Sequence, residues 1–259
     1  MASLAPLSRK RILITRAKEQ AGAMAQAVRK YGGVPVEIPL LHLVPSEGMQ
    51  KYKNLSIYNW IIFTSQNGVR FFLEGLGKER IPLSVKIAAV GEKTKGMLEK
   101  AGYTVAFVPS AYVAEVFVKE FTPLVKAGER VLFPKGDLAR DVIPIGLRAS
   151  GVMLDEAVAY ETKHNEAARA RLIAALQEEK VDVITFTSPS TVTAFVVLLE
   201  GTEWRQWVKR CTIGCIGPVT EQEACKYFDF LIVPKQYTIE ALLESVAKYF
   251  EDNGTIRIQ

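Results

Sequence analysis

Two short loops of the chain carry side chains that are suited to holding an anion. Residues 63–69 read FTSQNGV, and residues 186–192 read FTSPSTV. In each loop a Thr-Ser pair follows the end of an apolar run and precedes a segment with helical periodicity. Hydroxyls and unpaired backbone N–H groups at a helix start bind carboxylates and phosphates well. The alternative for each loop is helix capping alone, which contributes about 1 kcal/mol and explains most Ser and Thr residues at such positions.

The two loops belong to an internal repeat that covers most of the chain. Residues 60–76, WIIFTSQNGVRFFLEGL, match residues 183–199, VITFTSPSTVTAFVVLL. Residues 86–121 then match residues 211–250 in the same order. The chain is therefore duplicated, and each copy carries the same set of loops.

The second match pairs two further loops. Gly91 corresponds to Gly217, and Thr94 corresponds to Thr220. Each glycine ends an apolar run and precedes a helical pattern, as the Thr-Ser pairs do. We therefore expect backbone N–H groups and small hydroxyls to gather at corresponding places in both copies.

A third kind of unit completes each copy and indicates the fold class. Residues 10–40 resemble residues 129–159, and both read as strand, polar loop, helix, glycine stop and strand. Short, continuous apolar strands that alternate with amphipathic helices predict a parallel sheet with helices on both faces. The expected class is α/β, with two similar lobes that each have a parallel sheet flanked by helices.

The strand signals leave one pairing open. Each half has three signals of its own, which are WIIFT, IAAVG and TVAFVP in one half and DVITFT, CTIGCIG and FLIVP in the other. A tandem chain would join RILIT to residues 60–121, whereas a chain that runs out and back would join RVLFP to them. Residues 34–45 and 153–163 read as extended segments longer than one sheet requires. They favour a two-stranded β connector and the out-and-back path.

The expected domain organisation follows from that path. One lobe is discontinuous and combines residues 1–37 with residues 163–259. The inserted lobe spans residues 52–152, and residues 38–51 and 153–162 form the two-stranded linker. Ligands of open parallel sheets bind at the carboxyl ends of the strands. We therefore expect the loops of both lobes to line one cleft.

Composition predicts a soluble protein of the cytoplasm. The chain has 259 residues, of which 49% are hydrophobic and 24% charged, and its formal net charge is +5. No apolar run is long enough to span a membrane, and the positive charge is too dispersed to indicate a nucleic-acid partner, although it favours an anionic ligand. The basic cluster in MASLAPLSRKRILITRA follows a weak apolar patch, which is the reverse of a secretory signal.

Several kinds of chemistry are disfavoured. The sequence has no dinucleotide-binding or P-loop glycine motif, and its histidines are His42 and His164. On one strand, Cys211 and Cys215 would lie about 13 Å apart, too far to share a metal ion. Together with Cys225 they read as free thiols, which suit a reducing compartment. We expect no metal site.

In order, the motifs resemble those of uroporphyrinogen-III synthase, an enzyme family of tetrapyrrole biosynthesis. The set is ILITRA, WIIFTSQNGV, IAAVGEKT, VLFPKGDLARDVIP, AVAYET, VITFTSPSTV, IGCIGPVT and VPKQYTIEALL, and it covers nearly the whole chain. Each motif is weak by itself, but their order and total length make the joint match specific. The resemblance implies two α/β lobes that are joined by a two-stranded ladder.

The resemblance also implies a reaction. The family converts hydroxymethylbilane, a linear tetrapyrrole bearing eight carboxylates, to uroporphyrinogen III. The terminal hydroxyl leaves as water, and the far pyrrole ring attacks the resulting azafulvene cation and is inverted through a spiro intermediate. No cofactor is implied, because the substrate supplies both electrophile and nucleophile. The expected partner is this small molecule alone, with no nucleic acid and no membrane, and the expected state is a monomer.

Roles for individual residues follow from the resemblance. Tyr160 in AVAYET matches the family's tyrosine, and a tyrosine hydroxyl keeps its proton at neutral pH, so Tyr160 is the expected acid for departure of the hydroxyl. Packing alone is the alternative for an aromatic residue at a strand end. The matched substrate-binding positions are Arg16, Thr64, Ser65, Gly91, Thr94, Lys135, Arg140, Ser188, Ser190, Thr191, Gly217, Thr220 and Tyr237. For Lys135 and Arg140 the alternative is a charge exposed to solvent.

Two other kinds of protein would share this organisation. A bilobal solute-binding protein has a comparable hinge and cleft, but it normally carries an export signal. A regulatory protein could keep the fold and lose catalysis. The alternative to the enzyme is therefore a catalytically inactive regulatory or small-molecule-binding protein of the same bilobal fold.

Overall fold

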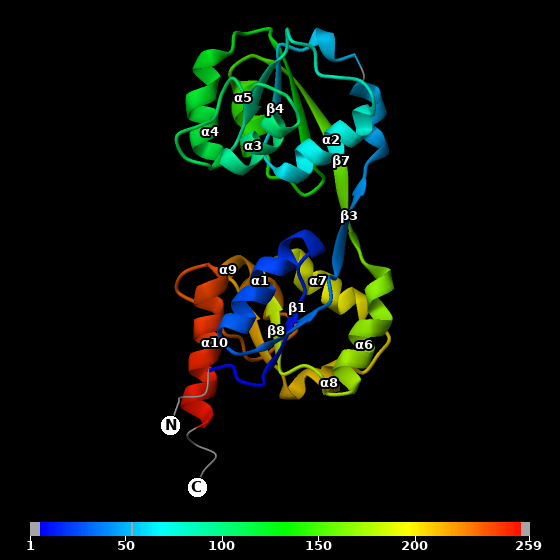
Figure 1. The fold of residues 1–259 in the computed structure, drawn as a ribbon, viewed down its shortest axis with the longest axis vertical. Coiled ribbons are helices and arrows are strands. Elements are labelled where there is room, and N and C mark those ends of the chain that lie inside the picture. The colour runs from blue at the N-terminus through cyan, green and yellow to red at the C-terminus, as the bar shows by residue number, and fades with distance from the viewer. Residues whose placement is uncertain (1–5, 53, 255–259) are drawn as a thin grey trace. The chain divides into compact units, whose positions relative to one another are not determined.

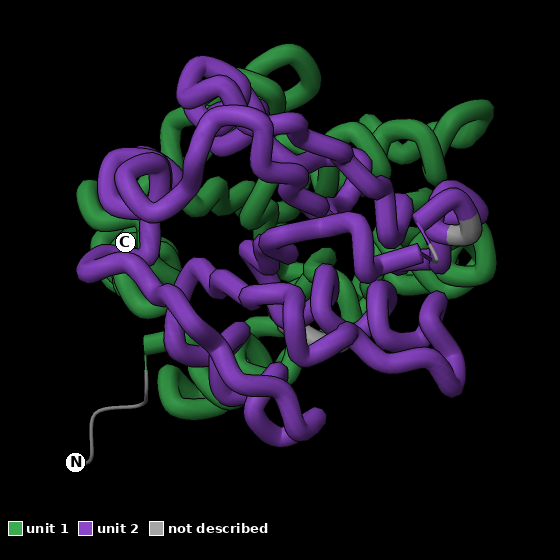
Figure 2. Tube along the Cα trace, turned by 90° about the horizontal axis from the view of Figure 1, so that it is seen from above, with its two compact units in different colours: residues 1–42, 163–259 green, residues 43–162 purple. Residues whose placement is uncertain are grey.

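The computed structural model describes residues 6–52 and 54–254. The chain divides into two compact units, which are shown in different colours in Figure 2. Unit 1 combines residues 1–42 with residues 163–259, and unit 2 comprises residues 43–162.

Unit 1 contains a parallel sheet of four strands in the order β2-β1-β8-β9. The strands are β1 (Arg11–Ile14), β2 (Val34–Glu37), β8 (Val183–Phe186) and β9 (Thr212–Cys215). The helices are α1 (Lys18–Lys30), α6 (Arg169–Gln177), α7 (Pro189–Leu198), α8 (Trp204–Trp207), α9 (Pro218–Ala224) and α10 (Ile239–Gly254). Alternate strand residues belong to two separate apolar clusters, one with α6 to α9 and one with α1 and α10. Helices thus cover both faces.

Unit 2 follows the same plan around a sheet of five strands in the order β3-β7-β6-β4-β5. The strands are β3 (Leu41–Pro45), β4 (Trp60–Phe63), β5 (Lys86–Ala89), β6 (Arg130–Gly136) and β7 (Met153–His164). The helices are α2 (Gln66–Leu76), α3 (Glu92–Lys100), α4 (Ala114–Phe121) and α5 (Val142–Ala149). One apolar cluster joins the sheet to α2 and α3, and another joins it to α4 and α5. The four helices are labelled in Figure 1. The expected α/β class is confirmed.

Helix α2 illustrates how local sequence sets an element. The side chain of Ser65 accepts a hydrogen bond from the N–H of the third helical residue and begins the helix. Val69, Phe72 and Leu76 are buried at helical spacing and pack into the core of unit 2. Gly77 ends the helix with φ of 63°, a conformation that glycine adopts without strain.

The strand pairing resolves the path that the sequence left open. β1 pairs with β8 in unit 1, and β6 pairs with β4 in unit 2, as in a chain that runs out and back. β3 lies beside β7. Their hydrogen bonds join Ser46 to Ala159 and Leu40 to Asn165, so the two segments run in opposite directions. Both boundaries between the units fall within these two strands.

The third segment that was expected to be a strand in each half does not form a regular strand. Residues 104–109 and 230–234 contribute only the isolated bridges of Phe107 with Ala88 and of Ile232 with Gly214. A proline follows two residues after each bridge, at Pro109 and Pro234. Proline has no backbone N–H to donate, so the pairing ends at these positions.

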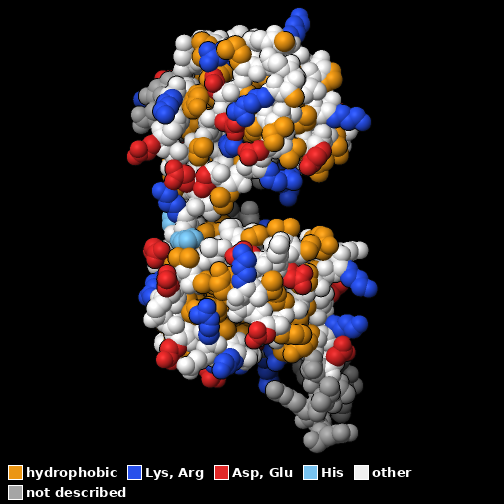
Figure 3. All heavy atoms as spheres, turned by 180° about the vertical axis from the view of Figure 1, so that it is seen from behind, with side chains coloured by type: hydrophobic (Ala, Val, Ile, Leu, Met, Phe, Trp, Pro, Cys, Tyr) orange, Lys and Arg blue, Asp and Glu red, His pale blue; other side chains and the backbone are white. Residues whose placement is uncertain are grey.

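Two further observations concern apolar helices and surface charge. No helix within the described residues is long and apolar enough to cross a membrane. On the face shown in Figure 3, Lys and Arg side chains are interspersed with Asp and Glu in both units.

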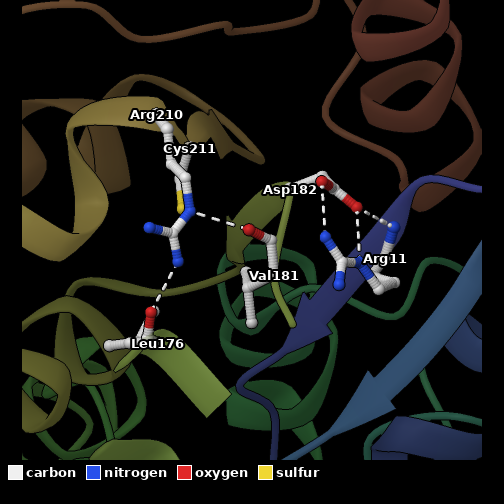
Figure 4. A network of polar contacts seen from close by, with 6 residues as sticks. All are labelled: Arg11, Leu176, Val181, Asp182, Arg210 and Cys211. Carbon is white, nitrogen blue, oxygen red and sulfur yellow. Dashed lines mark hydrogen bonds and ion pairs between the residues drawn. The ribbon is translucent and has the colours of Figure 1, made fainter. Parts of the chain in front are cut away.

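A polar network joins the amino ends of three strands of unit 1 (Figure 4). The guanidinium of Arg11 donates to both carboxylate oxygens of Asp182, at 2.9 and 3.0 Å, and its backbone N–H donates at 2.7 Å. The thiol of Cys211 donates to the carbonyl of Val181 at 3.4 Å. Partial burial acts to raise the pKa of Asp182, but the hydrogen bonds from Arg11 outweigh it and hold that pKa below its ordinary value. The charged form therefore stabilises the sheet.

Replacing Asp182 with Asn should lower the free energy of unfolding at pH 7 by about 1–2 kcal/mol, because the charge-assisted hydrogen bonds are weakened in a partly exposed pair. A carboxylate with a lowered folded pKa stabilises above its unfolded pKa and loses that effect as pH falls through the folded pKa. The difference in the free energy of unfolding between the wild type and the Asp182→Asn variant should therefore shrink below roughly pH 4. Urea unfolding followed by tryptophan fluorescence measures it, since Trp204 and Trp207 lie in unit 1.

The matched control is Glu178→Gln, which removes an exposed carboxylate paired with Lys180 and should change stability by less than about 0.5 kcal/mol. If Asp182→Asn lowers the free energy of unfolding equally at pH 7 and at pH 3, the charge of Asp182 is not the source of the stabilisation.

Candidate functional site

A cavity of about 300 Å³ lies within unit 2, beside the carboxyl ends of β4 and β6. Four of the residues expected to form a site line it, namely Thr64, Ser65, Arg140 and Tyr160. The other lining residues are Ala114, Phe133, Gly136, Asp137, Leu138, Ala139, Ile143 and Thr162. Hydroxyls, a guanidinium and a carboxylate thus share one opening with apolar walls.

The ring of Tyr160 is held between two neighbours. On β7 it stands opposite Gly136 of β6, where the register of the two strands shifts. A Cβ atom at Gly136 would lie 2.6–2.8 Å from the ring and hydroxyl atoms of Tyr160, so any side chain there would occupy the place of the ring. The ring also stacks on Phe71, with centroids 5.2 Å apart. Glycine at 136 is therefore a condition for this position of Tyr160.

Asp137 fixes the backbone around that tyrosine. Its N–H donates to the carbonyl of Tyr160 at 3.1 Å, and its Oδ1 accepts from the N–H of Thr162 at 3.0 Å. These two bonds extend the pairing of β6 with β7 beyond the regular ladder. The backbone of β7 is consequently held by hydrogen bonds at Tyr160 itself and at Thr162.

Ser65 and Ser188 occupy the same position in the two units, as the residues that begin α2 and α7. The Oγ of Ser65 accepts from the N–H of Gly68 at 3.0 Å, and that of Ser188 accepts from the N–H of Thr191 at 3.3 Å. Both serines are therefore the N-cap residues of their helices. A hydroxyl that accepts such a bond still carries a proton that it can donate, so capping does not preclude contact with an anion.

The loop of unit 1 has an additional hydroxyl network. The Oγ atoms of Ser188 and Ser190 lie 2.9 Å apart. The hydroxyl of Thr191 donates to the carbonyl of Ser188 at 2.7 Å, and the residue is only 3% exposed. Ser188 and Ser190 are thus available at the surface of the loop, whereas Thr191 holds its shape.

Gly91 and Gly217 occupy the same position in the two units, as the residues that begin α3 and α9. The N–H groups of Thr94 and Thr220 donate to the carbonyls of these glycines at 3.1 Å, and both threonines are buried in the first turn of their helices. A Cβ atom at Gly217 would lie 3.1 Å from the ring of Tyr237, so the ring covers the glycine. The threonines shape the loops from inside.

Lys135 does not line the cavity. Its ammonium lies 2.5 Å from a carboxylate oxygen of Glu156, whose other oxygen lies 2.6 Å from Arg148. Partial burial acts to raise the pKa of Glu156, but the hydrogen bonds from Lys135 and Arg148 hold it below its ordinary value. Lys135 is 11% exposed, so its charge is balanced inside the fold.

The two arginines of the expected site differ in their surroundings. Arg140 lines the cavity, is 72% exposed and lies 3.8 Å from Glu115, a loose contact that an anion can replace. Arg16 follows β1 in unit 1 and is half-buried, and burial lowers its pKa. A guanidinium remains charged despite such a shift.

Sequence reasoning missed three features of the structure. Gly136 and Asp137 stand in the quoted segment VLFPKGDLARDVIP, but the need for glycine opposite Tyr160 arises from strand register, which one sequence does not reveal. Tyr112 packs against Gly91 as Tyr237 packs against Gly217. The signal for Tyr112 was present, because VPSAY at 108–112 repeats as VPKQY at 233–237.

A family model and the curated relatives that the chain matches point to the same family. The family model described as "Uroporphyrinogen-III synthase HemD" matches residues 22–244. The "Porphyrin biosynthesis protein HemD" of Ruminiclostridium josui is 28% identical over 93% of this chain, and this chain spans about half of that protein, 49%. The "Uroporphyrinogen-III synthase" of Synechococcus elongatus is 29% identical, and the match covers 94% of this chain and 97% of that protein.

A solved structure supports the fold. The uroporphyrinogen-III synthetase of Helicobacter pylori superposes with a TM-score of 0.64 at 20% identity, covering 93% of this chain and 99% of that chain. At this identity the likeness concerns the architecture alone.

Replacing Gly136 with Ala should displace the ring of Tyr160 and lower the free energy of unfolding by about 1–3 kcal/mol, because the new methyl group overlaps the ring. The measurement is urea unfolding of both proteins, with a crystal structure of the variant to locate the ring. Gly96→Ala is the matched control in the same unit, since a Cβ atom there meets nothing within 4 Å and the residue lies inside α3. It should stabilise by about 0.5–1 kcal/mol. Equal stabilities for the two variants would contradict the close approach.

Proposed function

The chain belongs to the uroporphyrinogen-III synthase family, and from this membership we propose that it converts hydroxymethylbilane to uroporphyrinogen III. The observation that carries the proposal is the agreement of a match over residues 22–244 with a cavity that presents Tyr160 among hydroxyl and cationic groups. The reaction is a cyclising loss of water, so the activity is that of a lyase in porphyrin and heme biosynthesis.

The first step is loss of the terminal hydroxyl. The C–O bond breaks, the oxygen takes a proton from the hydroxyl of Tyr160 and leaves as water, and the substrate becomes an azafulvene cation. Tyr160 suits this step because its ring is fixed by Gly136 and Phe71 beside a cavity open to ligands. A fixed donor loses little orientational freedom when the substrate binds.

The second step depends on how the substrate is held more than on a proton donor. The far pyrrole ring attacks the cation through its substituted carbon, and the spiro intermediate reopens with that ring inverted. The macrocycle then closes through the free α-carbon of that ring, and the proton lost from this carbon restores the hydroxyl of Tyr160. Free in solution, the same cation closes without inversion, so the protein must hold both ends of a flexible chain in one arrangement. We infer that carboxylate contacts distributed along the substrate provide this control.

Loops of both units contribute those contacts in this proposal. In unit 2 the carboxylates are bound by Thr64, Ser65 and Arg140, which line the cavity. In unit 1 they are bound by residues of the repeated loops, with a charge from Arg16. The unit 1 hydroxyl donors are Ser188, Ser190 and Tyr237. The backbone N–H groups that follow Gly91 and Gly217 add further donors.

Four of the expected residues act indirectly in this proposal. Thr94, Thr191 and Thr220 are buried and shape the loops that contain them. Lys135 balances the charge of Glu156 and thereby maintains β6 and β7 beneath the cavity.

We further propose that the protein acts as a monomer in the cytoplasm. Its cysteines are free thiols, and burial raises the pKa of Cys211 to about 11 and that of Cys215 to about 12. Thiols of this kind resist oxidation because the reactive thiolate is scarce. They suit a reducing compartment.

The direct test is to incubate the protein with freshly prepared hydroxymethylbilane and to separate type I from type III uroporphyrinogen by chromatography. The wild-type chain should yield mainly type III. Tyr160→Phe should lower the rate of type III formation by roughly a hundredfold, because it removes the acid while keeping the stacked ring. The proportion of type I should rise as uncatalysed closure takes over.

Tyr103→Phe is the matched control, since Tyr103 lies in unit 2 beneath Arg80 and outside the cavity lining. It should keep the wild-type rate. A wild-type chain that yields only type I would overturn the proposed function. A Tyr160→Phe variant with the wild-type rate would overturn only the acid role of Tyr160.

A further inference from the structure

Tyr112 and Tyr237 occupy equivalent positions in the two copies of the repeat. Each is the fifth residue of a Val-Pro-x-x-Tyr segment, which reads VPSAY at 108–112 and VPKQY at 233–237. The residues around them have changed, since Ser-Ala precedes one tyrosine and Lys-Gln the other, and Val-Ala follows one and Thr-Ile the other. The tyrosine is the same in both copies, whereas the two residues on each side of it differ.

The structure gives the two rings the same contact. A Cβ atom at Gly91 would lie 3.5–3.8 Å from Tyr112, and one at Gly217 would lie 3.1–3.5 Å from Tyr237. Gly91 follows β5, which pairs with β4, and Gly217 follows β9, which pairs with β8. Each tyrosine therefore lies one strand away from the loop that contains the Thr-Ser pair of its own unit.

Packing does not account for either ring. Tyr112 is 57% exposed and Tyr237 is 62% exposed, so neither serves the apolar core. Within the described part of the chain, neither hydroxyl has a hydrogen-bond partner. Other tyrosines of the protein do bond through theirs: Tyr31 to Glu244, Tyr52 to the carbonyl of Glu156, and Tyr58 to Asp155.

We propose that Tyr112 is a substrate-binding residue of unit 2 and the functional counterpart of Tyr237, each hydroxyl donating a hydrogen bond to one carboxylate of the tetrapyrrole. This inference rests on the proposed function. A tyrosine hydroxyl that faces solvent is a good donor to a carboxylate, and the adjacent glycine lets the ring approach the backbone closely. The duplication thus supplies matching aromatic donors as well as matching Thr-Ser loops.

The test compares Tyr112→Phe, Tyr237→Phe and the double variant in steady-state assays with hydroxymethylbilane. Each single change should raise KM by roughly tenfold, since a hydrogen bond to a charged group is lost, and should leave kcat within about twofold. The double variant should raise KM by nearly the product of the two single effects. The ratio of type III to type I product from the enzyme-bound fraction should not change.

Tyr31→Phe is the control, because it removes a hydroxyl bonded to Glu244 on the surface of unit 1. It should leave KM and kcat unchanged. Thermal unfolding of all variants provides a second readout, in which the Tyr112 and Tyr237 changes should have little effect because both rings are exposed.

The outcomes separate the inference from the proposed function. An active wild-type chain with an unchanged KM in Tyr112→Phe overturns the inference and leaves the function intact. A lowered melting temperature with an unchanged KM would likewise overturn it and assign Tyr112 a structural role. A wild-type chain that makes no type III product overturns both.

Discussion

Parallel pairing of short, fully buried strands is the interaction on which both units depend. β4 and β8 are buried at every residue, so each needs apolar cover on both faces, and helices provide it. Neighbouring strands of a parallel sheet run in the same direction, so their carboxyl ends lie along one edge. The loops that lead into α2, α3, α7 and α9 consequently gather at those edges, and the proposed chemistry takes place there.

The position of Tyr160 follows from the same pairing. β7 runs parallel to β6, and the shift in register near the end of β6 brings Gly136 opposite Tyr160. The absent side chain of the glycine makes room for the ring, and Phe71 of α2 closes it from another side. A residue proposed to donate a proton is thus fixed by backbone pairing, by packing and by the hydrogen bonds of Asp137.

Much of the fold was predictable because its causes are local. Apolar runs such as WIIF and VITF, the serine caps and the stop at Gly77 specify strands and helices within a few residues. Register is a long-range property, so neither the role of Gly136 nor the charge balance of Lys135 with Glu156 could be predicted. The prolines at 109 and 234 signalled shorter strands than the apolar pattern indicated.

The central proposal is that the strand-end loops of each unit bind carboxylates of the substrate. Amide hydrogen exchange of the full chain, with and without uroporphyrinogen III under reducing conditions, tests it most directly. The account predicts slower exchange in two regions together, at residues 64–68 of unit 2 and at residues 188–191 of unit 1. Slower exchange in one unit alone, or in neither region, would contradict it.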